Sequence, residues 1–479
     1  MSTGLQNAVP LRPGAAAATA LTGGTAASVA ARLDRLPASR AVWTLVVLLS
    51  LGGWFEFYDL FLTGYIAPAL LKEGLYTAGE ASPFAAGAFA SFIASFFAGL
   101  FIGTMLLGWV ADRFGRRTIF TLALLWYSAA MAVMAFQHSA QAINLWRFLA
   151  GLGVGVELVT IDTYLAELIP PALRGRAFAA NQAITFSMVP VVALVGWLLV
   201  PTAPLGFAGW RWMMLIGATG AIAVWWIRRA LPESPRWLAQ HGRTAEADAA
   251  MRELEARVAA ETGPLPPPAP APAVQPGRGS LAEAFRPPLL SRTVMMSVVS
   301  VLQTVGFYGF ANWVPTLLIA EGIGVTHSLF YTFLIALANP FGPILAYALG
   351  DRVDRKWQFA GACAALALTG LWFGAQRAPA LIVVAGLAVT LSATFMSYAL
   401  HAYQAELFPT RIRARAVGFV YSWSRLSVVC SGYIIAWVLA AAGTNAVFAL
   451  IAGAMLCCSI ILGLFGPRTS GQALEHIAH

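Results

Sequence analysis

Apolar residues follow one another in twelve long runs, six on each side of one extended polar stretch. The runs lie near 43–71, 84–111, 118–137, 141–169, 174–200, 209–230, 293–320, 327–350, 357–376, 379–405, 415–440 and 445–466. About 20 apolar residues span the hydrocarbon of a bilayer as a helix, because lipid offers the backbone no hydrogen-bond partner. The pattern therefore predicts an all-α, polytopic membrane protein with twelve transmembrane helices in two six-helix bundles.

The polar stretch at 231–292 is the predicted linker between the bundles. It contains a helical candidate from Thr244 to Ala260 with one apolar side, followed by a proline-rich segment at 264–272 that is typical of extended polyproline. The chain starts with an Ala-, Gly- and Thr-rich segment that we expect to be disordered and that shows no signal-peptide pattern. The expected parts are a tail at 1–40, bundles at 41–230 and 293–466, the linker at 231–292, and a second tail at 467–479.

Composition narrows the class further. Apolar residues make up 59% of the chain, charged residues make up 11%, and the mean hydropathy is +0.72. A soluble chain is about 45–50% apolar and about 25% charged, so these values exclude a secreted disulfide scaffold, a disordered chain and an ordinary nucleic-acid binder. We find no Walker loop, nucleophile elbow or His-Glu-x-x-His pair, and therefore expect no enzyme, no cofactor and no metal site.

The position of the basic residues predicts orientation. When both termini are placed in the cytoplasm, nearly all arginines that flank the runs fall inside, and only Lys72, Arg211 and Arg377 fall outside. The net charge of +9 then reflects topology and anionic lipid headgroups rather than nucleic acid. We expect a monomer in a bacterial-type inner membrane, with a small molecule, protons and membrane lipid as its partners.

The two sets of runs are an internal repeat. Asp112-Arg113 follows run two, and Asp351-Arg352 follows run eight, 239 residues later. The same offset carries three further residues onto their counterparts: Tyr164 onto Tyr403, Glu167 onto Glu406, and Arg174 onto Arg413. Parallel duplicated bundles of this kind are typical of transporters that work by alternating access.

Three motifs, in order, resemble signatures of the major facilitator superfamily and of its sugar-porter-like branch. They are Gly-x-x-x-Asp-Arg-x-Gly-Arg-Arg at 108–117, Arg147-x-x-x-Gly151-x-Gly153-x-Gly155 followed by Tyr164-x-x-Glu167-x-x-Pro170, and Pro-Glu-Ser-Pro-Arg-Trp-Leu at 232–238. The resemblance covers about residues 41–466. It implies a twelve-helix fold whose two bundles rock around a central cavity. Inside an apolar helix, the Gly151 run predicts close helix packing rather than a nucleotide loop, as does Gly99-x-x-x-Gly103.

Ionisable residues inside the apolar runs are the candidate chemistry, because each costs about 2.5–3.5 kcal/mol at the centre of a bilayer. Glu56 and Asp59 share one face of the first run, and Arg147 lies in the fourth. The resemblance to proton-coupled sugar porters implies that Asp59 carries the proton and that Arg147 is its charge partner. A static buried ion pair is the alternative, and Glu56 either shares the proton role or balances charge.

The charged residues at the cytoplasmic ends resemble the gating networks of the family. In the first half the resemblance pairs Arg113 with Glu167 and Arg174, and in the second half it pairs Arg352 with Glu406 and Arg413. These networks lock the two halves on the inner side when the cavity opens outward. Asp112 and Asp351 alternatively cap a neighbouring helix start. The full gating set is Gly108, Asp112, Arg113, Arg116, Arg117, Glu167, Arg174, Asp351, Arg352, Glu406 and Arg413.

Residues in runs seven, ten and eleven indicate which class of substrate the protein binds. Sugar porters show paired glutamines in run seven and a Gly-Pro with a following Trp in run ten, whereas this chain has only Gln303 and neither feature. By contrast, the segment 57–64, Glu157 and Arg425 resemble the metabolite and aromatic-acid proton symporters, and the fork of Arg425 suits a carboxylate. The substrate-binding candidates are Arg425, His401, Gln303, Asn312, Tyr308, Gln182 and Glu157.

The leading prediction is proton-coupled symport of a small organic anion, such as an aromatic or heterocyclic carboxylate. A sugar or polyol symporter and a proton-driven exporter of amphipathic compounds remain as alternatives. A receptor without transport activity is a further alternative, which the presence of Asp59 and Arg147 disfavours because a receptor needs no proton site.

Overall fold

The computed structural model describes residues 26–77, 87–106, 110, 113–268, 280–349, 353–409 and 412–468. Eight helices among these residues are long and apolar enough to cross a membrane. One of them, α19 (Arg413–Phe465), turns at Gly443, whose φ of 77° favours glycine, and so contains the last two runs. Together with the helices of runs two, six and nine, the described helices account for every run. The twelve-helix, all-α fold is confirmed.

The first half contains eight helices and one short turn of 3₁₀-helix among the described residues. They are α3 (Arg40–Lys72), α4 (Phe89–Leu106), α6 (Arg116–Met134), α7 (Ala140–Leu168), α8 (Pro171–Phe186), α9 (Met188–Leu199), η1 (Pro204–Gly206), α10 (Gly209–Ala218) and α11 (Gly220–Ala230). Run five is divided into α8 and α9, where Pro190 removes a backbone donor from the first turn of α9. Ser39 and Ser139 cap α3 and α7 by accepting backbone N–H bonds.

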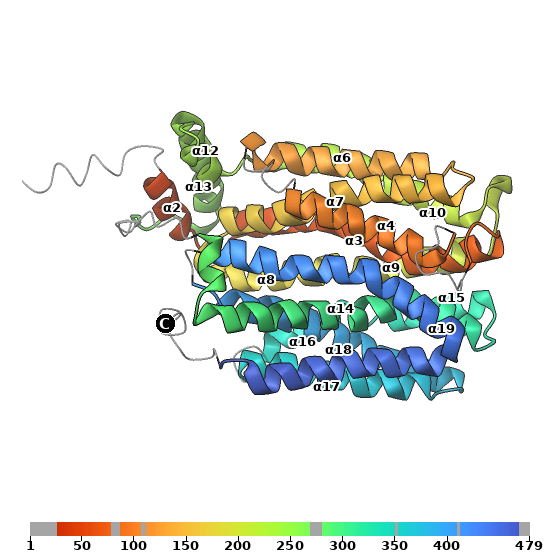
Figure 1. Ribbon diagram of the computed structural model, residues 1–479. Helices are drawn as coiled ribbons and strands as arrows, with labels where there is room; N and C mark the ends of the chain where they lie inside the picture. The colour runs from red at the N-terminus through yellow and green to blue at the C-terminus, as the bar shows by residue number, and fades with distance from the viewer. Residues whose placement is uncertain are drawn as a thin grey trace, which may run out of the picture.

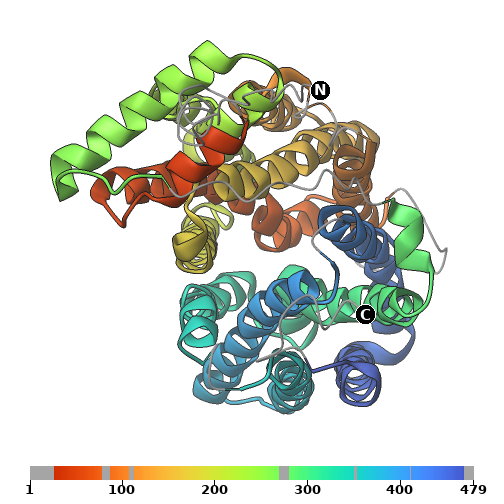
Figure 2. The same cartoon turned by 90° about the vertical axis from the view of Figure 1, so that its left-hand side faces the viewer.

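The second half repeats this plan. Its other helices are α14 (Leu289–Ala320), α15 (Val325–Ala336), α16 (Phe341–Leu349), α17 (Arg355–Gly374) and α18 (Pro379–Glu406). Run eight is divided into α15 and α16 by a turn that contains Pro340, which cannot continue the helical hydrogen bonds. Figure 1 shows the long helices lying side by side, and Figure 2, viewed along them, shows the first half on one side and the second half on the other.

A layer of short helices covers one end of the first half (Figure 1). It consists of α2 (Ala26–Asp34), α12 (Pro235–Gln240) and α13 (Thr244–Thr262), while η2 (Leu281–Phe285) lies against the second half. The apolar side of α13 is buried, as its sequence pattern predicts. We expected the N-terminal tail at 1–40 to be disordered, but its residues Ala26–Asp34 form the helix α2. The rest of that tail, residues 1–25, lies outside the described residues.

Ion pairs hold α2 on α13 and explain why this part of the tail is ordered. The Arg32 guanidinium lies 2.6 Å from Asp248 and 2.6 Å from Glu255, and Arg35 lies 2.5 Å from Glu255. Partial burial of the Glu255 carboxyl opposes ionisation. The hydrogen bonds from the two arginines outweigh this, so the pKa of Glu255 is lowered from its usual value. The ion pairs with α13 therefore explain why α2 is ordered, which the composition of the tail alone did not predict.

Close packing of α4 on α7 brings two transmembrane helices of the first half together, as the glycine runs predict. A Cβ atom at Gly99 would lie 2.1 Å from the carbonyl oxygen of Phe148, and one at Gly151 would lie 2.2 Å from that of Phe96. Only glycine permits this approach, because any side chain would overlap the opposing backbone. This close contact places the rings of Phe92 and Phe96 in α4 over the buried guanidinium of Arg147 in α7, which is described below.

The two halves touch closely at the end opposite to α12 and α13. A Cβ atom at Gly64 of α3 would lie 2.8 Å from the carbonyl oxygen of Ala311 in α14. Trp197 of α9 is stacked on Phe333 of α15 with ring centroids 6.0 Å apart. By the predicted orientation this is the periplasmic side, where the halves are therefore packed together.

Candidate proton and substrate site

Asp59 and Arg147 form an ion pair in the middle of the first half, as the sequence predicts. Both side chains are fully buried, and Arg147 Nη1 donates to Asp59 Oδ1. Arg147 Nη2 also donates to the Asp59 carbonyl at 2.8 Å and to Thr63 Oγ1 at 2.6 Å. Asp59 Oδ2 has no hydrogen-bond partner among the described residues, which leaves one carboxylate oxygen available to a proton.

Aromatic rings cover the other side of this ion pair. The Arg147 guanidinium lies over the ring of Phe96, 4.1 Å from its centroid, and 4.9 Å from that of Phe92. Rings at these distances attract a cation and keep water out. The close α4–α7 packing places these rings, so the glycine contacts and the ion pair belong to one arrangement.

Glu56 and Glu157 are two further buried acids of the first half. Glu157 of α7 is fully buried, and neither of its carboxylate oxygens has a hydrogen-bond partner among the described residues. Glu56 of α3 is 2% exposed, and its Oε1 atom has no partner there either. An ionised carboxylate without partners is costly in such surroundings. Both acids are therefore candidates for holding a proton.

A central cavity of about 100 Å³ lies between the two halves. Its polar lining is drawn from both, and the residues are Glu56, Asp162, Asn181, Gln182, Thr185, Tyr308, Ser397, His401, Tyr421 and Arg425. Two acids thus face one arginine and one histidine across the space where a substrate would sit. The described residues hold no group of three or more His, Cys, Asp or Glu arranged for a metal ion.

Arg425 is the buried cation of this cavity. Its Nη1 donates to the Tyr308 hydroxyl at 2.9 Å and its Nη2 to the Tyr421 hydroxyl at 3.3 Å, while the guanidinium lies 4.8 Å from the centroid of the Tyr421 ring. The Nε–H group has no partner among the described residues. A guanidinium has five donors, so the two tyrosines leave donors for an anion.

His401 lies beside the same tyrosine. Its Nδ1 is 2.7 Å from the Ser397 carbonyl, so this nitrogen carries the proton and Nε2 is left for the cavity. The His401 ring is 5.2 Å from that of Tyr421. The wall formed by α18 and α19 thus offers a cation, an aromatic face and a second polar nitrogen.

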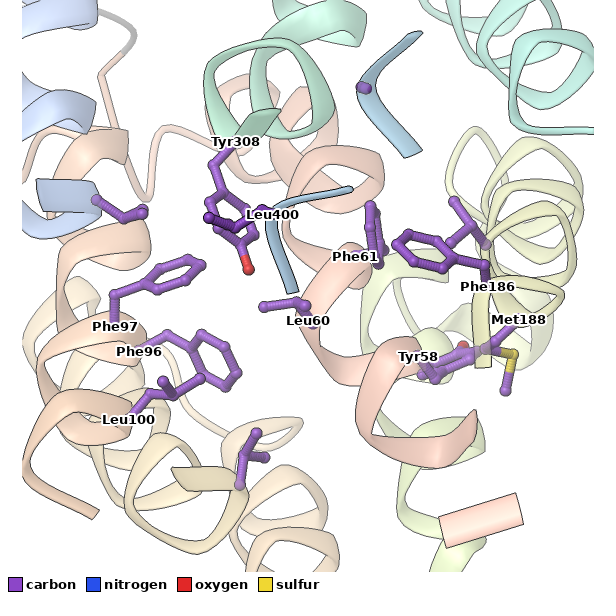
Figure 3. Packing of buried hydrophobic residues seen from close by; sticks show 14 of the residues in the cluster. Tyr58, Leu60, Phe61, Phe96, Phe97, Leu100, Phe186, Met188, Tyr308 and Leu400 are labelled. Carbon is purple, nitrogen blue, oxygen red and sulfur yellow. The ribbon is translucent and has the colours of Figure 1, made fainter. Parts of the chain in front are cut away.

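Aromatic residues close one end of the cavity. Phe57 and Phe61 of α3, Phe186 of α8 and Phe307 of α14 form a ring cluster with centroid distances between 5.0 and 6.4 Å. Figure 3 shows Phe61 beside Phe186, and Phe97 of α4 facing Tyr308. Phe61 and Phe307 also line a second, smaller space of about 40 Å³. The cluster therefore separates the central cavity from the packed end of the molecule.

The structure separates the predicted binding residues into two groups. Arg425, His401, Tyr308 and Gln182 line the central cavity. Gln303, Asn312 and Glu157 are buried in their helices and are not among its lining residues in the described part of the chain. Because a helix shows only one face to a cavity, polar character alone did not separate these two groups.

Asp162 is a cavity residue to which the sequence analysis gave no role. Its side chain is exposed to the cavity, and it lies one helical turn beyond Leu158 and next to Ile161, which also line it. Asp162 and His401 are 239 residues apart, as are Gln182 and Tyr421. The repeat offset was therefore a usable signal, because it relates Asp162 to a histidine already counted as a binding candidate.

Two predicted gating acids, Glu167 and Glu406, each form an ion pair within the described residues, and the partner of Glu406 is Arg355, which was not among the predicted gating residues. Arg116 Nη2 lies 3.0 Å from Glu167 and Arg355 Nε lies 3.5 Å from Glu406, two pairs related by the 239-residue offset. The predicted partner of Glu167 was Arg113. Arg113 instead precedes the turn at Gly115 and is exposed, with its guanidinium 5.6 Å from the Phe114 ring. Each pair joins helices of the same half.

The remaining gating residues have other contacts or lie outside the description. The Arg174 Nε donates to the Ile169 carbonyl at 3.2 Å, and the amide groups of Arg116 and Arg117 donate to Glu233 at 2.9 and 3.1 Å. Glu233 thus supplies the negative charge at the start of α6. Gly108, Asp112, Asp351, Arg352 and the side chain of Arg413 lie outside the described residues.

Known proteins are similar to this chain in sequence and in fold. Residues 45–479 match the family described as "Sugar (and other) transporter". The "Putative metabolite transport protein YyaJ" of Bacillus subtilis is 33% identical over 451 residues, which cover 93% of this chain and 97% of that protein. The "Niacin transporter NiaP" of Acinetobacter baylyi is 28% identical over 448 residues, covering 93% and 98%.

A solved structure shows the same fold. The partially occluded, inward-open form of the xylose transporter XylE from Escherichia coli superposes with a TM-score of 0.74 at 19% sequence identity. The match covers 91% of this chain and all of that one. Similarity at this level of identity concerns the arrangement of the helices alone.

Proposed function

Because the chain belongs to the sugar (and other) transporter family of the major facilitator superfamily, we propose that it carries a small organic anion together with protons. The family is one of membrane transporters rather than enzymes. The proposed substrate is a monocarboxylate attached to an aromatic or heterocyclic ring. Transport would proceed by alternating access across the bacterial inner membrane.

Arg425 is the observation that carries the substrate proposal. It is 3% exposed, lines the central cavity, and keeps its Nε–H without a protein partner among the described residues. A carboxylate accepting from this nitrogen and a neighbouring one would form the two-point contact that guanidinium groups favour. The Tyr421 and His401 rings beside it would stack on a planar substrate.

The relative NiaP supports this class of substrate, since niacin is a pyridine ring that bears one carboxylate. The solved xylose–proton symporters favour a sugar instead. Sugars are neutral and bind through networks of neutral hydrogen-bond groups, so a buried arginine with a free donor is less suited to them than to an anion.

The acids of the cavity would connect substrate binding with protons. Glu56 and Asp162 line the same space as Arg425, and Glu56 interacts electrostatically with Arg425 and with Asp59. An incoming anion is repelled by these carboxylates while they are ionised, and a bound proton removes that repulsion. Proton uptake would therefore favour anion binding, which is the coupling that symport requires.

Asp59 is the proposed proton carrier. In the structure it is paired with Arg147, which is the arrangement expected after its proton has been released. The close packing at the predicted periplasmic end fits an inward-facing state in which release to the cytoplasm has taken place. Protonation from the other side would weaken the pair and prepare the next cycle.

A binding experiment tests the substrate class. The Tm of purified protein is measured with niacin, benzoate, nicotinamide and xylose, because a ligand present at 100 times its Kd adds about 2.7 kcal/mol of stability. We expect the two acids to raise the Tm of the wild type and nicotinamide to have little effect. Arg425→Ala should abolish the preference for acids, while Tyr308→Phe, which keeps the ring, should preserve it. Stabilisation by xylose but by neither acid would favour the sugar alternative.

A further inference from the structure

Glu157 of α7 is a buried acid that has no part in the function proposed above. Its side chain is fully buried, and in the described part of the chain it is not among the lining residues of the central cavity. Neither of its carboxylate oxygens has a hydrogen-bond partner there. An ionised carboxylate enclosed without partners is costly, whereas the protonated form is neutral. The surroundings of Glu157 therefore favour a carboxyl group that holds a proton.

The carboxyl group of Glu157 lies against α3, one helical turn from Glu56. A Cβ atom at Gly52 would lie 3.1 Å from Glu157 Oε1, so the lack of a side chain at this position leaves room for the carboxyl group. Glu56 follows four residues after Gly52 and therefore lies on the same face of α3. The two acids interact electrostatically, and Glu56 also lines the central cavity. Two neighbouring acids in such surroundings do not both ionise, because like charges repel.

Tyr127 of α6 adds a hydroxyl group beside these acids. Its side chain is fully buried, and its hydroxyl has no hydrogen-bond partner among the residues that the structure describes. A Cβ atom at Gly153, one turn before Glu157, would lie 3.4 Å from Tyr127 Cβ. The hydroxyl interacts electrostatically with Glu157, Glu56 and Asp59. Because a hydroxyl both donates and accepts, it suits a neighbourhood in which one acid is protonated and another is not.

The arginines of the neighbourhood are engaged with other groups. Arg147 precedes Glu157 by ten residues, which is about 15 Å along α7, and is held in the ion pair described above. Arg425 interacts electrostatically with Glu56 from across the central cavity. On α7 itself, Asp162 is exposed to that cavity. Helix α4 has no titratable residue, and the arginines of α6 and α8 lie in the first two turns of those helices.

We propose that Glu56 and Glu157 share one proton and form a second proton-binding site of the transporter, in addition to Asp59. This inference rests on the proposed symport of an organic anion. A substrate carboxylate that binds Arg425 screens Glu56 from the arginine, so the two acids keep the shared proton. After the substrate has left, Arg425 again favours ionised Glu56, and the proton passes to water in the cavity. Each monocarboxylate would therefore cross with two protons and one net positive charge.

Infrared spectroscopy of the purified full-length protein tests the shared proton without any substrate. The C=O stretch of a protonated carboxylic acid is separate from the bands of a carboxylate. Near neutral pH, we expect the wild type to show this band and, because the group is enclosed, to exchange it only slowly in D₂O. Glu157→Gln should lose the slowly exchanging band. Glu253→Gln makes the same substitution at an acid that Arg257 already engages at 2.5 Å, and should keep it. Absence of the band in the wild type, or its persistence in Glu157→Gln, would overturn the proposal.

Proteoliposomes test the transport of the second proton. At zero membrane potential, each coupled proton contributes about tenfold to the accumulation ratio per unit of pH gradient. We expect labelled benzoate or niacin to accumulate about 100-fold per pH unit in the wild type and about tenfold in Glu157→Gln. Uptake by the variant should also no longer respond to an inside-negative membrane potential, because the remaining proton balances the charge of the anion.

The outcomes separate this inference from the proposed function. Accumulation with equal slopes in the wild type and Glu157→Gln would overturn the second coupled proton and leave organic-anion symport intact. The infrared band without accumulation of either acid would support the shared proton and contradict the organic-anion proposal. If Glu157→Gln does not purify as a folded protein, Glu56→Gln is used, and it should reduce the slope by the same tenfold factor.

Discussion

The two halves of the molecule share the contacts that hold their helices together and differ in the residues that line the central cavity. At one end, Arg116–Glu167 in the first half and Arg355–Glu406 in the second half occupy equivalent positions of the repeat. Tyr164 likewise donates to the Pro232 carbonyl, as its counterpart Tyr403 donates to a proline carbonyl that follows α19. The duplicated sequence has kept the contacts that hold neighbouring helices of one half together.

Around the central cavity the equivalent positions are occupied by different residues. Four pairs of lining residues are related by the 239-residue offset: Leu158 with Ser397, Asp162 with His401, Gln182 with Tyr421, and Phe186 with Arg425. The first half supplies the acids, and the second half supplies the cation and the histidine. Duplication thus provided two walls of similar shape, and divergence gave one wall the chemistry for protons and the other the chemistry for an anion.

Asp59→Asn is expected to have the largest effect, because it removes the proposed carrier from the first half. Uphill uptake driven by a pH gradient in proteoliposomes should be lost, while counterflow exchange should be retained in part because it needs no net proton movement. Uptake of the labelled acid checks both. Normal accumulation by this variant would assign the proton to another acid, with Glu56 examined next.

Arg425→Lys tests the second half. It keeps the positive charge and removes the fork, so binding of the acid should weaken by about 1–3 kcal/mol, or about 5–150-fold in Kd. Isothermal titration with the acid and its amide measures the change. Ser424→Ala is the matched control, since that hydroxyl is buried in the same helix and, among the described residues, donates to the Tyr421 carbonyl. An unchanged ratio of acid to amide affinity in the Arg425 variant would make the arginine structural.

Arg116→Ala and Arg355→Ala compare the Arg116–Glu167 ion pair with the equivalent Arg355–Glu406 ion pair. The Arg116 pair is shorter and less exposed, with side-chain exposures of 8% and 15% against 19% and 30% for the Arg355 pair. Removing Arg116 should therefore cost about 1–2 kcal/mol of stability, and removing Arg355 about 0.2–1 kcal/mol. Thermal unfolding of the purified variants measures the order. A larger loss for Arg355→Ala would contradict this comparison.

Glu255→Gln addresses the contact between α2 and α13 at the end of the first half and should have the smallest effect. It weakens the hold of α13 on α2, and hydrogen exchange in Ala26–Asp34 should become faster. The control is Glu246→Gln, which removes an exposed pair between Arg243 and Glu246 at the start of α13. Transport by either variant should be unchanged.

The pH dependence of this contact has a definite sign. The pKa of Glu255 is lowered in the folded protein, so its contribution is complete above the ordinary glutamate pKa of about 4.3 and is lost as the pH falls through the lower, folded value. Protection of α2 should therefore be constant near neutral pH and decrease only in acid. A decrease between pH 6 and 8 would point to another group.

Much of this molecule was predictable from its sequence, because lipid imposes strong conditions. Each apolar run had to be a helix, and the duplicated motifs had to place equivalent residues at equivalent ends. The meeting of Asp59 and Arg147 was predictable for the same reason, since a buried charge requires a partner at its own depth. Glycine spacing likewise predicted close helix packing at Gly99 and Gly151, and the structure shows that these two helices, α4 and α7, pack on each other.

Tertiary structure alone decided which residue of a face meets which partner. Glu167 pairs with Arg116 rather than Arg113 because α6 begins at Arg116 and turns that side chain onto α7. Asp162 reaches the cavity, whereas Gln303 does not line it. The 3.6-residue period specifies a face of each helix, but the rotation and crossing of neighbouring helices determine what that face touches. Those contacts join residues far apart in the chain, and only the packed bundle brings them together.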